Sequence, residues 1–278
     1  MKARRRQEAH EELPPGRYEE LRDEIIRLGP WHLEVEVAPG LTTRTFLDAP
    51  PGTYVGSGEL DPDRITFIDP RIDFDPLIAA IYGERGLEGR SFLDCACNAG
   101  AYCFLARESG ASRCFGFDVR EHWIAQARFL ADNRIGPSDG VDFEVLDLYD
   151  LPNRSADPFD VTLFKGIFYH LPDPITGLKL AADMTKEIII VDTSTRPDMP
   201  EGTLTVGRES RKGMMSGVYG LNWRPSGPSV VAYILRWMGF ADARLVYNGE
   251  ATGRKGLGRM RVVAAREPGL LEAYEPIE

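Results

Sequence analysis

The sequence predicts an α/β protein: a doubly wound, Rossmann-like sheet, mostly parallel, with an antiparallel C-terminal hairpin and an N-terminal extension. Two observations predict this fold class. From residue 75 onward, short apolar runs alternate with amphipathic helical stretches, which is typical of βαβ units around a parallel sheet. Before residue 75 the chain is rich in proline, glycine and aspartate, and its apolar runs are short. We therefore assign residues 1–74 to the extension and residues 75–278 to the main domain.

The extension is expected to hold one helix and a few short strands. Tyr18, Leu21, Ile25 and Ile26 follow helical spacing, which predicts a short helix behind the charged N-terminal residues. Three β-like pieces come after it, over residues 31–37, 42–47 and 64–68.

The main domain is expected to open with a helix that begins at Asp75-Pro76 and ends near Gly83 or Gly86. Short apolar runs then predict strands over residues 91–95, 113–117, 141–146, 159–164 and 187–191. Helical spacing predicts the intervening helices over residues 101–109, 121–133 and 175–184.

The alternation stops after Asp192. Residues 193–225 show little periodicity, and a loop of about 30 residues inside a compact domain is usually functional, so we predict a lid insertion there. A helix over 226–239 follows, and then two strands over 243–247 and 260–265. Because a glycine-rich stretch joins these strands, they are expected to close the sheet edge as an antiparallel hairpin.

Composition excludes several classes of protein. The chain has 278 residues, 43% of them hydrophobic, which is enough for a core and excludes global disorder. The net charge of −10 disfavours a nucleic-acid partner. The sequence has no apolar run long enough for a membrane span and no secretory signal, so we expect a cytoplasmic protein. The four cysteines lack paired CxxC spacing and are expected to be buried, reduced thiols rather than a metal site.

Small and acidic residues gather where the first two strands end. The turn after the first strand contains Asp94, Cys95, Ala96, Asn98 and Gly100. Small side chains let a ligand approach the backbone closely. Asp118, which Val119 follows, ends the next strand, where an acid in doubly wound folds accepts hydrogen bonds from ribose hydroxyls. Only Gly100 remains of a G-x-G-x-x-G fingerprint, so a dinucleotide is poorly supported, whereas Asp94 favours a cationic nucleoside.

This turn, together with Asp118, Asp147 and the stretch FDVTLFKGIFYHLP at 159–172, resembles the ordered motifs of class I S-adenosylmethionine-dependent methyltransferases. The resemblance covers roughly residues 75–265. Within that superfamily the chain is most similar to the group that contains the tRNA wobble-uridine carboxymethyltransferases, because of its Tyr169-His170 pair and its Gly29-Pro30-Trp31 segment.

The resemblance implies S-adenosylmethionine as the cofactor and a role for each motif. The small-residue turn would hold the amino-acid half of the cofactor, and Asp118 would bind the ribose diol. Asp147 and Leu148 would bracket the adenine, and Lys165 would line the site near the reacting methyl group. Trp123 is either a core residue or a wall of the adenosine site.

Two departures from the family pattern bear on function. Ala96 and Asn98 stand where the family usually has glycine; both are small, and asparagine tolerates a left-handed backbone. These changes leave a non-catalytic protein of the same fold as an alternative. Leu28 stands before Gly29-Pro30, where the tRNA group has a basic residue that reads the extra carboxylate of an unusual cofactor. An apolar side chain cannot pair with that charge, so plain S-adenosylmethionine is expected.

We expect methyl transfer to a hydroxyl of a small metabolite, with His170 as the general base or else as a structural group, and Tyr169 beside it. The expected substrate contacts are Tyr169, Arg208, Asn222 and Trp223. The basic residues of the predicted lid form either a solvated face or an anion site, and they keep an RNA-modifying methyl- or carboxymethyltransferase as a second alternative; they are Arg208, Arg211, Lys212 and Arg224.

Overall fold

The structure is a computed structural model that describes residues 14–48, 67–154, 157–211, 213, 215–249 and 256–277. Its contacts divide the chain into two compact units. The first unit comprises residues 1–69 and 128–136, and the second comprises residues 70–127 and 137–278. None of the described helices is long and apolar enough to cross a membrane.

The first unit packs around one buried tryptophan. Its helix α1 (Arg17–Leu28) is followed by β1 (Glu36–Ala38), β2 (Leu41–Thr42) and the 3-10 helix η1 (Thr43–Asp48). Trp31 is fully buried, donates a hydrogen bond from Nε1 to the Ile25 carbonyl oxygen at 2.8 Å, and lies with its ring centroid 6.0 Å from that of Phe129. The predicted helix is confirmed, and Leu28 is part of its buried face.

Two of the predicted β pieces in this unit are wrong for most of their length. Only 36–37 of the piece 31–37 is strand, and 43–47 forms a 3-10 helix, because the buried Thr43 and Phe46 recur at a three-residue spacing. Of the piece 64–68, residues 64–66 lie outside the described residues, and Ile68 forms an isolated bridge with Leu33.

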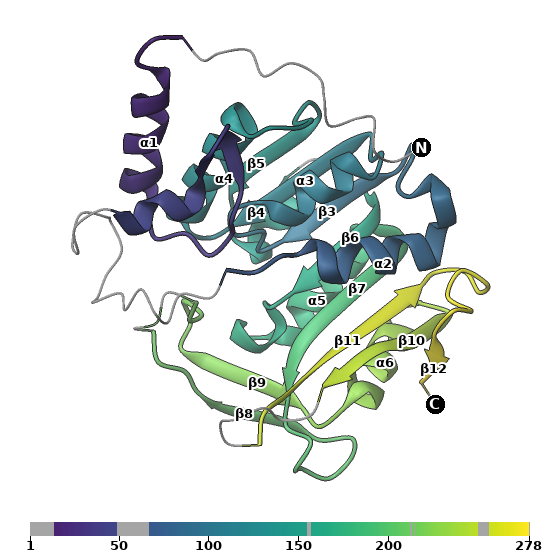
Figure 1. Ribbon diagram of the computed structural model, residues 1–278. Helices are drawn as coiled ribbons and strands as arrows, with labels where there is room; N and C mark the ends of the chain where they lie inside the picture. The colour runs from purple at the N-terminus through teal and green to yellow at the C-terminus, as the bar shows by residue number, and fades with distance from the viewer. Residues whose placement is uncertain are drawn as a thin grey trace. The chain divides into compact units, whose positions relative to one another are not determined.

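The second unit contains an eight-stranded sheet with the order β12-β10-β11-β7-β6-β3-β4-β5 (Figure 1). Its parallel strands are β3 (Ser91–Cys95), β4 (Arg113–Asp118), β5 (Val141–Val145), β6 (Phe159–Lys165) and β7 (Thr185–Thr195). The antiparallel strands at one side are β10 (Asp242–Gly249), β11 (Gly258–Ala265) and β12 (Glu275–Pro276). The predicted α/β class and the C-terminal hairpin are confirmed. Strand order reverses at β3, which pairs with both β4 and β6, and open α/β sheets bind ligands outside the carboxyl ends of the strands at such a point.

The helices that follow the first unit's N-terminal part are α2 (Arg71–Tyr82), α3 (Ala101–Glu108), α4 (Glu121–Asn133), α5 (Pro174–Asp183) and α6 (Pro228–Trp237). All lie in the second unit except the last residues of α4, from Arg128 on, which belong to the first. Three short 3-10 helices follow α2, β5 and β6 in the chain: η3 (Gly83–Arg85), η4 (Leu148–Asn153) and η5 (Phe168–His170). The start of α2 differs from the expectation: the helix begins at Arg71, so Asp75 and Pro76 lie inside it rather than at its first turn.

Residues 193–225 are not one irregular loop as predicted. Strand β7 continues to Thr195, and β8 (Leu204–Arg208) pairs antiparallel with β9 (Leu221–Pro225). These strands are partly exposed and carry mixed polar and apolar side chains, so the apolar-run criterion did not detect them.

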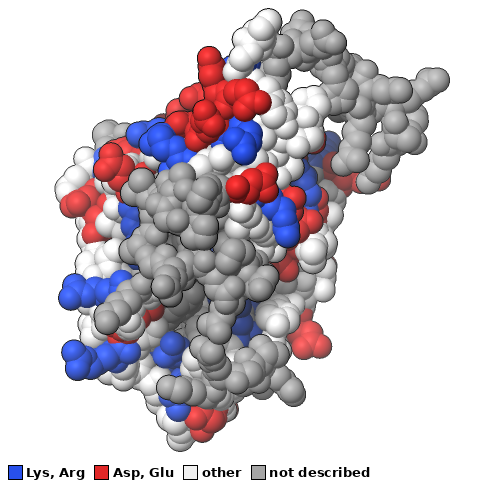
Figure 2. All heavy atoms as spheres, turned by 60° about the vertical axis from the view of Figure 1, so that its left-hand side comes forward, with Lys and Arg blue, Asp and Glu red and all other residues white. Residues whose placement is uncertain are grey.

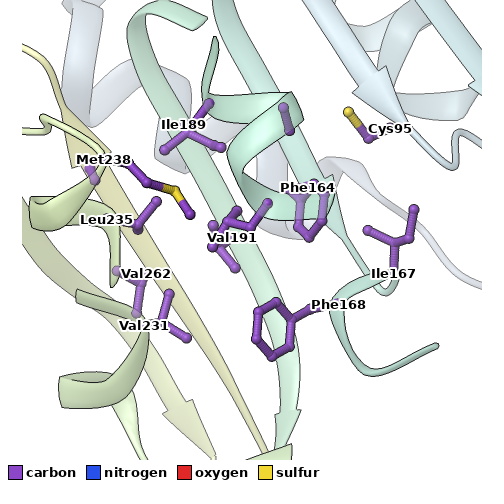
Figure 3. Packing of buried hydrophobic residues seen from close by; sticks show 14 of the residues in the cluster. Cys95, Phe164, Ile167, Phe168, Ile189, Val191, Val231, Leu235, Met238 and Val262 are labelled. Atoms are coloured by element: carbon purple, nitrogen blue, oxygen red, sulfur yellow. The ribbon is translucent and has the colours of Figure 1, made fainter. Parts of the chain in front are cut away.

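The core lies where β6, β7 and β11 meet the helices. Ile188 to Val191 are all fully buried, as expected for a strand that is covered on both faces. In Figure 3, Val231 and Leu235 of α6, and Met238 directly after it, lie near Ile189, Val191 and Val262 of the sheet. Burial of apolar surface contributes roughly 25 cal/mol per Å² to the stability of the fold. This cluster therefore stabilises the strands whose ends carry the candidate site.

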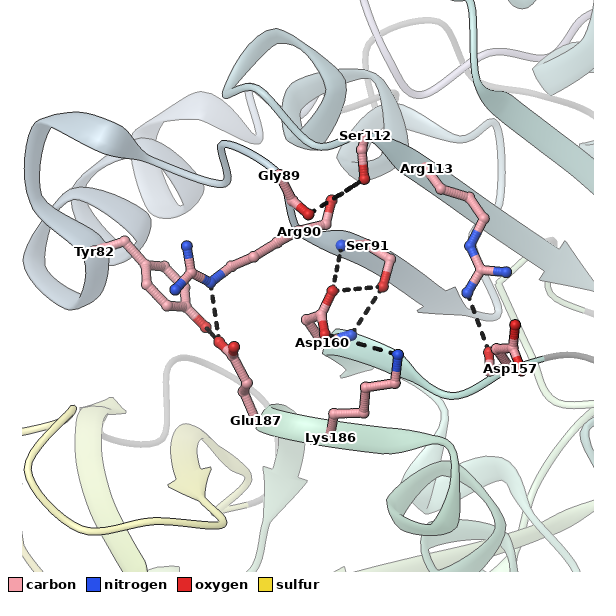
Figure 4. Close-up of polar contacts among 10 residues, drawn as sticks. All are labelled: Tyr82, Gly89, Arg90, Ser91, Ser112, Arg113, Asp157, Asp160, Lys186 and Glu187. Atoms are coloured by element: carbon pink, nitrogen blue, oxygen red, sulfur yellow. Dashed lines mark hydrogen bonds and ion pairs between the residues drawn. The ribbon is translucent and has the colours of Figure 1, made fainter.

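The amino ends of the strands are held by polar contacts (Figure 4). The Asp160 carboxylate accepts hydrogen bonds from the backbone N–H and the hydroxyl of Ser91, at 2.7 and 2.8 Å. Glu187 accepts from Arg90 Nε at 2.9 Å and from the Tyr82 hydroxyl at 3.1 Å. These carboxylates have protein partners, whereas Oδ2 of Asp94, near the opposite ends of the strands, has none among the described residues.

Candidate functional site

The turn after β3 adopts the backbone that glycine would favour. Ala96, Asn98 and Gly100 have φ angles of 60°, 54° and 80°. The left-handed region costs a residue with a Cβ atom roughly 1–2 kcal/mol. The Asn98 side chain offsets part of this cost, because its Oδ1 accepts a hydrogen bond from the Ala99 N–H at 2.7 Å. The turn therefore keeps its shape although glycine is absent at two positions.

Gly100 has a second constraint, which yields a stability prediction. A Cβ atom at Gly100 would lie 2.3 Å from Phe143 Cζ. We expect Gly100→Ala to lower the free energy of unfolding by about 2–4 kcal/mol, the sum of backbone strain and overpacking. Urea denaturation measures the change. Gly202→Ala is the matched control, because Gly202 has a φ of 78° and nothing within 4 Å of its would-be Cβ. Equal losses in the two variants would contradict the steric argument.

Asp94 is a buried carboxylate without a protein partner for one oxygen. The residue is 2% exposed, and Oδ2 has no hydrogen-bond partner among the described residues. Burial, and then the negative charge of Asp118, raise the pKa of Asp94 well above its usual range, while Lys165 opposes the shift. A cationic ligand group at this position would satisfy the oxygen and favour the ionised form.

Asp118 lies at the end of the neighbouring strand β4. Its carboxylate accepts hydrogen bonds from the backbone N–H of Asn98 at 3.2 Å and of Arg120 at 3.0 Å. Burial raises the pKa of Asp118, and these N–H groups oppose the rise. The structure thus brings Asp94, Asn98 and Asp118 together, as the sequence predicts. Val119 follows with 42% of its surface exposed, whereas Trp123 of α4 is buried.

Asp147 is the N-cap of η4 and lies two residues after the end of β5. One carboxylate oxygen accepts a hydrogen bond from the Tyr149 N–H at 3.0 Å, and the other accepts from the Tyr219 hydroxyl. The Leu148 side chain belongs to the buried core cluster. Tyr219 also meets the ring of Tyr149 edge to face, with 6.3 Å between centroids.

The ends of β6, β7 and β11 carry a charge network that sequence reasoning missed apart from Lys165. Asp192 is 1% exposed and forms ion pairs with Lys165 Nζ at 3.4 Å, Arg261 Nη2 at 2.8 Å and Arg259 Nε at 2.6 Å. Asp73 of α2 adds a second carboxylate, 2.8 Å from Arg261 and 3.6 Å from Lys165. Two carboxylates pair with the Lys165 ammonium and offset its positive charge. A cationic ligand nearby would therefore not meet an unpaired positive charge.

His170 ends η5, just beyond β6. Its Nδ1 lies 2.7 Å from Glu209 Oε2, and its ring centroid lies 4.1 Å from that of Tyr169. Burial lowers the pKa of His170, and the hydrogen bond to Glu209 raises it in part. The imidazole is therefore neutral at pH 7, the form that accepts a proton.

Residues 209–220, between β8 and β9, contact the ends of several strands. Met215 Sδ lies 4.0 Å from Asn98 Nδ2, Arg120 donates to the Ser216 carbonyl oxygen, and Tyr219 donates to Asp147. These contacts and Glu209 were not found from the sequence. Polar residues in a segment without apolar periodicity give no signal of what they touch.

The other predicted substrate residues divide into two groups. Asn222 and Trp223 lie in β9, which packs against η5, and Asn222 Oδ1 and Trp223 Nε1 are buried without a partner among the described residues. Arg208 and Arg211 are exposed. Lys212 lies outside the described residues. On the face shown in Figure 2, the described acidic and basic side chains are interspersed rather than gathered into one basic area.

These groups fit S-adenosylmethionine. The buried Asp94 oxygen without a partner among the described residues suits a cationic group of the ligand. The left-handed turn lets a ligand come close to the backbone. Two further carboxylates, Asp118 and Asp147, lie near the ends of β4 and β5. Asp94 and the turn would hold the amino-acid half, and Asp118 the ribose.

Comparison with known proteins gives the same fold. Residues 87–214 match the family model described as a methyltransferase domain. The tRNA U34 carboxymethyltransferase of Marinobacter nauticus is 31% identical over 176 residues, which are 60% of this chain and 48% of that protein. The chain thus spans about half the length of this relative. The ubiquinone biosynthesis O-methyltransferase of Neisseria meningitidis is 27% identical over 133 residues, which are 48% of this chain and 55% of that protein.

Among solved structures, the N-terminal domain of EvdMO1, crystallised in the presence of S-adenosylhomocysteine and D-fucose, superposes with a TM-score of 0.67 at 17% identity. The superposition covers 90% of this chain and 97% of that one. The family match, the curated relatives and the Rossmann-like sheet agree with one another. Residues 87–214 therefore match a methyltransferase domain, and the chain has the fold of solved methyltransferases with bound S-adenosylmethionine.

Proposed function

We propose that this protein transfers the methyl group of S-adenosylmethionine to a hydroxyl group of a small molecule, with His170 as the general base. One observation carries the proposal. A half-buried imidazole lies just beyond the end of β6, a strand that pairs with the strand of Asp94, and burial lowers the pKa of this imidazole. A hydroxyl acceptor must lose its proton during transfer, and a positioned imidazole can take it.

The cofactor supplies an activated methyl group: the acceptor oxygen bonds to the methyl carbon as the carbon–sulfur bond breaks, and the electron pair of that bond stays on sulfur. The protein supplies position and a proton acceptor. Asp94, Asp118 and Asp147 fix the cofactor from three successive strand ends, and His170 takes the hydroxyl proton. Tyr169, Asn222 and Trp223 surround the acceptor. Lys165, at the end of β6, lines the site near the methyl group, with its charge paired by Asp192 and Asp73.

The net charge of the chain and the names of similar proteins both favour a small molecule as the methyl acceptor. The net charge is −10, and a polyanion is repelled by such a field unless a basic patch offsets it. One relative is named as an O-methyltransferase of ubiquinone biosynthesis, and EvdMO1 was crystallised with a sugar. These names apply to those proteins, and they support a hydroxyl as the acceptor group here.

A second candidate function is modification of tRNA, which the 31% identity to the carboxymethyltransferase favours. Leu28 argues against a carboxylated cofactor, because it is buried and apolar where that group has a basic residue. A gel shift with bulk tRNA at low and at moderate salt separates the candidates. Binding that weakens steeply with salt would support the RNA function. No shift at low salt would remove it.

Methyl transfer itself is tested with S-adenosylmethionine labelled in the methyl group and a panel of sugars, phenols and quinols. We expect label in an acceptor that has a free hydroxyl, and none when that hydroxyl is already methylated. Binding of S-adenosylhomocysteine without transfer to any acceptor, tRNA included, would instead indicate a non-catalytic protein of this fold.

A further inference from the structure

Glu209 follows β8 and reaches a histidine 39 residues away in the chain. Its Oε2 lies 2.7 Å from His170 Nδ1 and also accepts a hydrogen bond from the Gly217 N–H at 3.1 Å. The side chains are largely shielded from solvent, with 17% of His170 and 13% of Glu209 exposed. This pair joins the predicted base to the segment between β8 and β9.

The chemistry of the two groups fixes which nitrogen carries the proton. A carboxylate only accepts hydrogen bonds, so at 2.7 Å the Nδ1 atom of a neutral His170 must be the donor. Nε2 then holds the lone pair. A carboxylate held against one ring nitrogen in this way sets the tautomer and stabilises the imidazolium that forms when the other nitrogen gains a proton.

We propose that Glu209 is a positioning residue for methyl transfer: it holds His170 with the proton on Nδ1, presents Nε2 to the acceptor hydroxyl, and stabilises the imidazolium once the proton has moved. This inference rests on the proposed function. The acceptor oxygen gains the methyl group and loses its proton to Nε2, so the developing positive charge lies next to Glu209.

The surrounding residues are arranged for this contact. Gly217 has no side chain, and a Cβ atom there would lie 2.8 Å from His170 Nδ1 and 2.7 Å from Glu209 Oε2. Among the described residues, the Tyr169 ring lies against the imidazole, and the charges of Arg120 and Arg224 lower the pKa of His170 while Glu209 raises it. Glu209 thus keeps the pKa of His170 from falling further.

The test compares Glu209→Gln with Glu201→Gln, a matched exposed glutamate before β8. With the acceptor found in the transfer assay, we expect Glu209→Gln to lower kcat tenfold or more, with little change in KM for S-adenosylmethionine. The rate of a neutral base falls at low pH as it becomes protonated. Losing Glu209 lowers the pKa of His170 further, so the acidic limb of the kcat profile should move to lower pH. Glu201→Gln should change neither quantity.

A second measurement needs no acceptor. The chain has four histidines, so the imidazole nitrogen signals of His170 can be identified in a nitrogen-15 NMR spectrum by their loss in His170→Gln. In the unsubstituted protein these signals should report a protonated Nδ1, and Glu209→Gln should shift the midpoint of their titration to lower pH. A protonated Nε2, or an unmoved midpoint and an unmoved kcat limb, would overturn the inference even in an active enzyme. Absence of transfer with the expected NMR signals would instead remove the proposed function and the role of Glu209 in it, and would leave the tautomer that Glu209 sets.

Discussion

Replacing Asp118 by alanine is expected to abolish measurable binding of S-adenosylhomocysteine. The Asp118 carboxylate lies at the end of β4, where it would accept hydrogen bonds from both ribose hydroxyls. Hydrogen bonds to a charged group contribute roughly 1.5–3 kcal/mol each, so loss of two predicts a 10²- to 10⁴-fold weaker complex. Isothermal titration calorimetry with the whole chain measures the change.

Asp118 also holds the N–H groups of Asn98 and Arg120, so part of the loss could come from the turn. Asp118→Asn separates the two effects, because the amide oxygen can still accept a hydrogen bond but the charge is gone. Asp142→Ala, an exposed acid on β5, is the control and should bind as the unsubstituted chain does. Unchanged affinity in Asp118→Ala would refute the ribose assignment.

Replacing His170 by alanine is expected to lower kcat by about 10²- to 10⁴-fold, the usual contribution of a general base, while leaving cofactor affinity intact. His170 lies beyond β6, whereas the proposed cofactor carboxylates lie at β3, β4 and β5, which is why binding and turnover should separate. The measurements are single-turnover methyl transfer and calorimetry on the same preparation.

Added imidazole should restore part of the rate in His170→Ala if the side chain moves a proton. A rate equal to that of the unsubstituted protein would show that His170 is structural. A fall in cofactor affinity that matches the fall in rate would place His170 in the binding site instead.

The sheet could be predicted from the sequence because its strands are buried and apolar. Strand β3 matches the expected residues 91–95, and α4 matches 121–133, since burial on one or both sides leaves a regular period in the sequence. Elements that lack such a buried, regularly spaced face were not predicted from the sequence. The β8–β9 hairpin is partly exposed, and η1 lies in a stretch whose β-branched threonines favoured a strand.

The candidate site divides in the same way. Asp94 and Asp118 lie at the carboxyl ends of strands and Asp147 lies just after one, so the topology alone brings them to one edge of the sheet. Glu209, Tyr219 and Asp192 could not be assigned contacts in advance. Glu209 and Tyr219 lie in a segment without apolar period, and the partners of Asp192 come from β6 and β11, which are distant from it in sequence.

A crystal structure with S-adenosylhomocysteine decides whether the carboxyl edge of β3 to β6 holds the cofactor. We predict the ribose hydroxyls at Asp118, the adenine next to Asp147 and the amino group near Asp94. An adenosyl group bound anywhere else on the protein, or no binding at saturating concentration, would contradict the assignment.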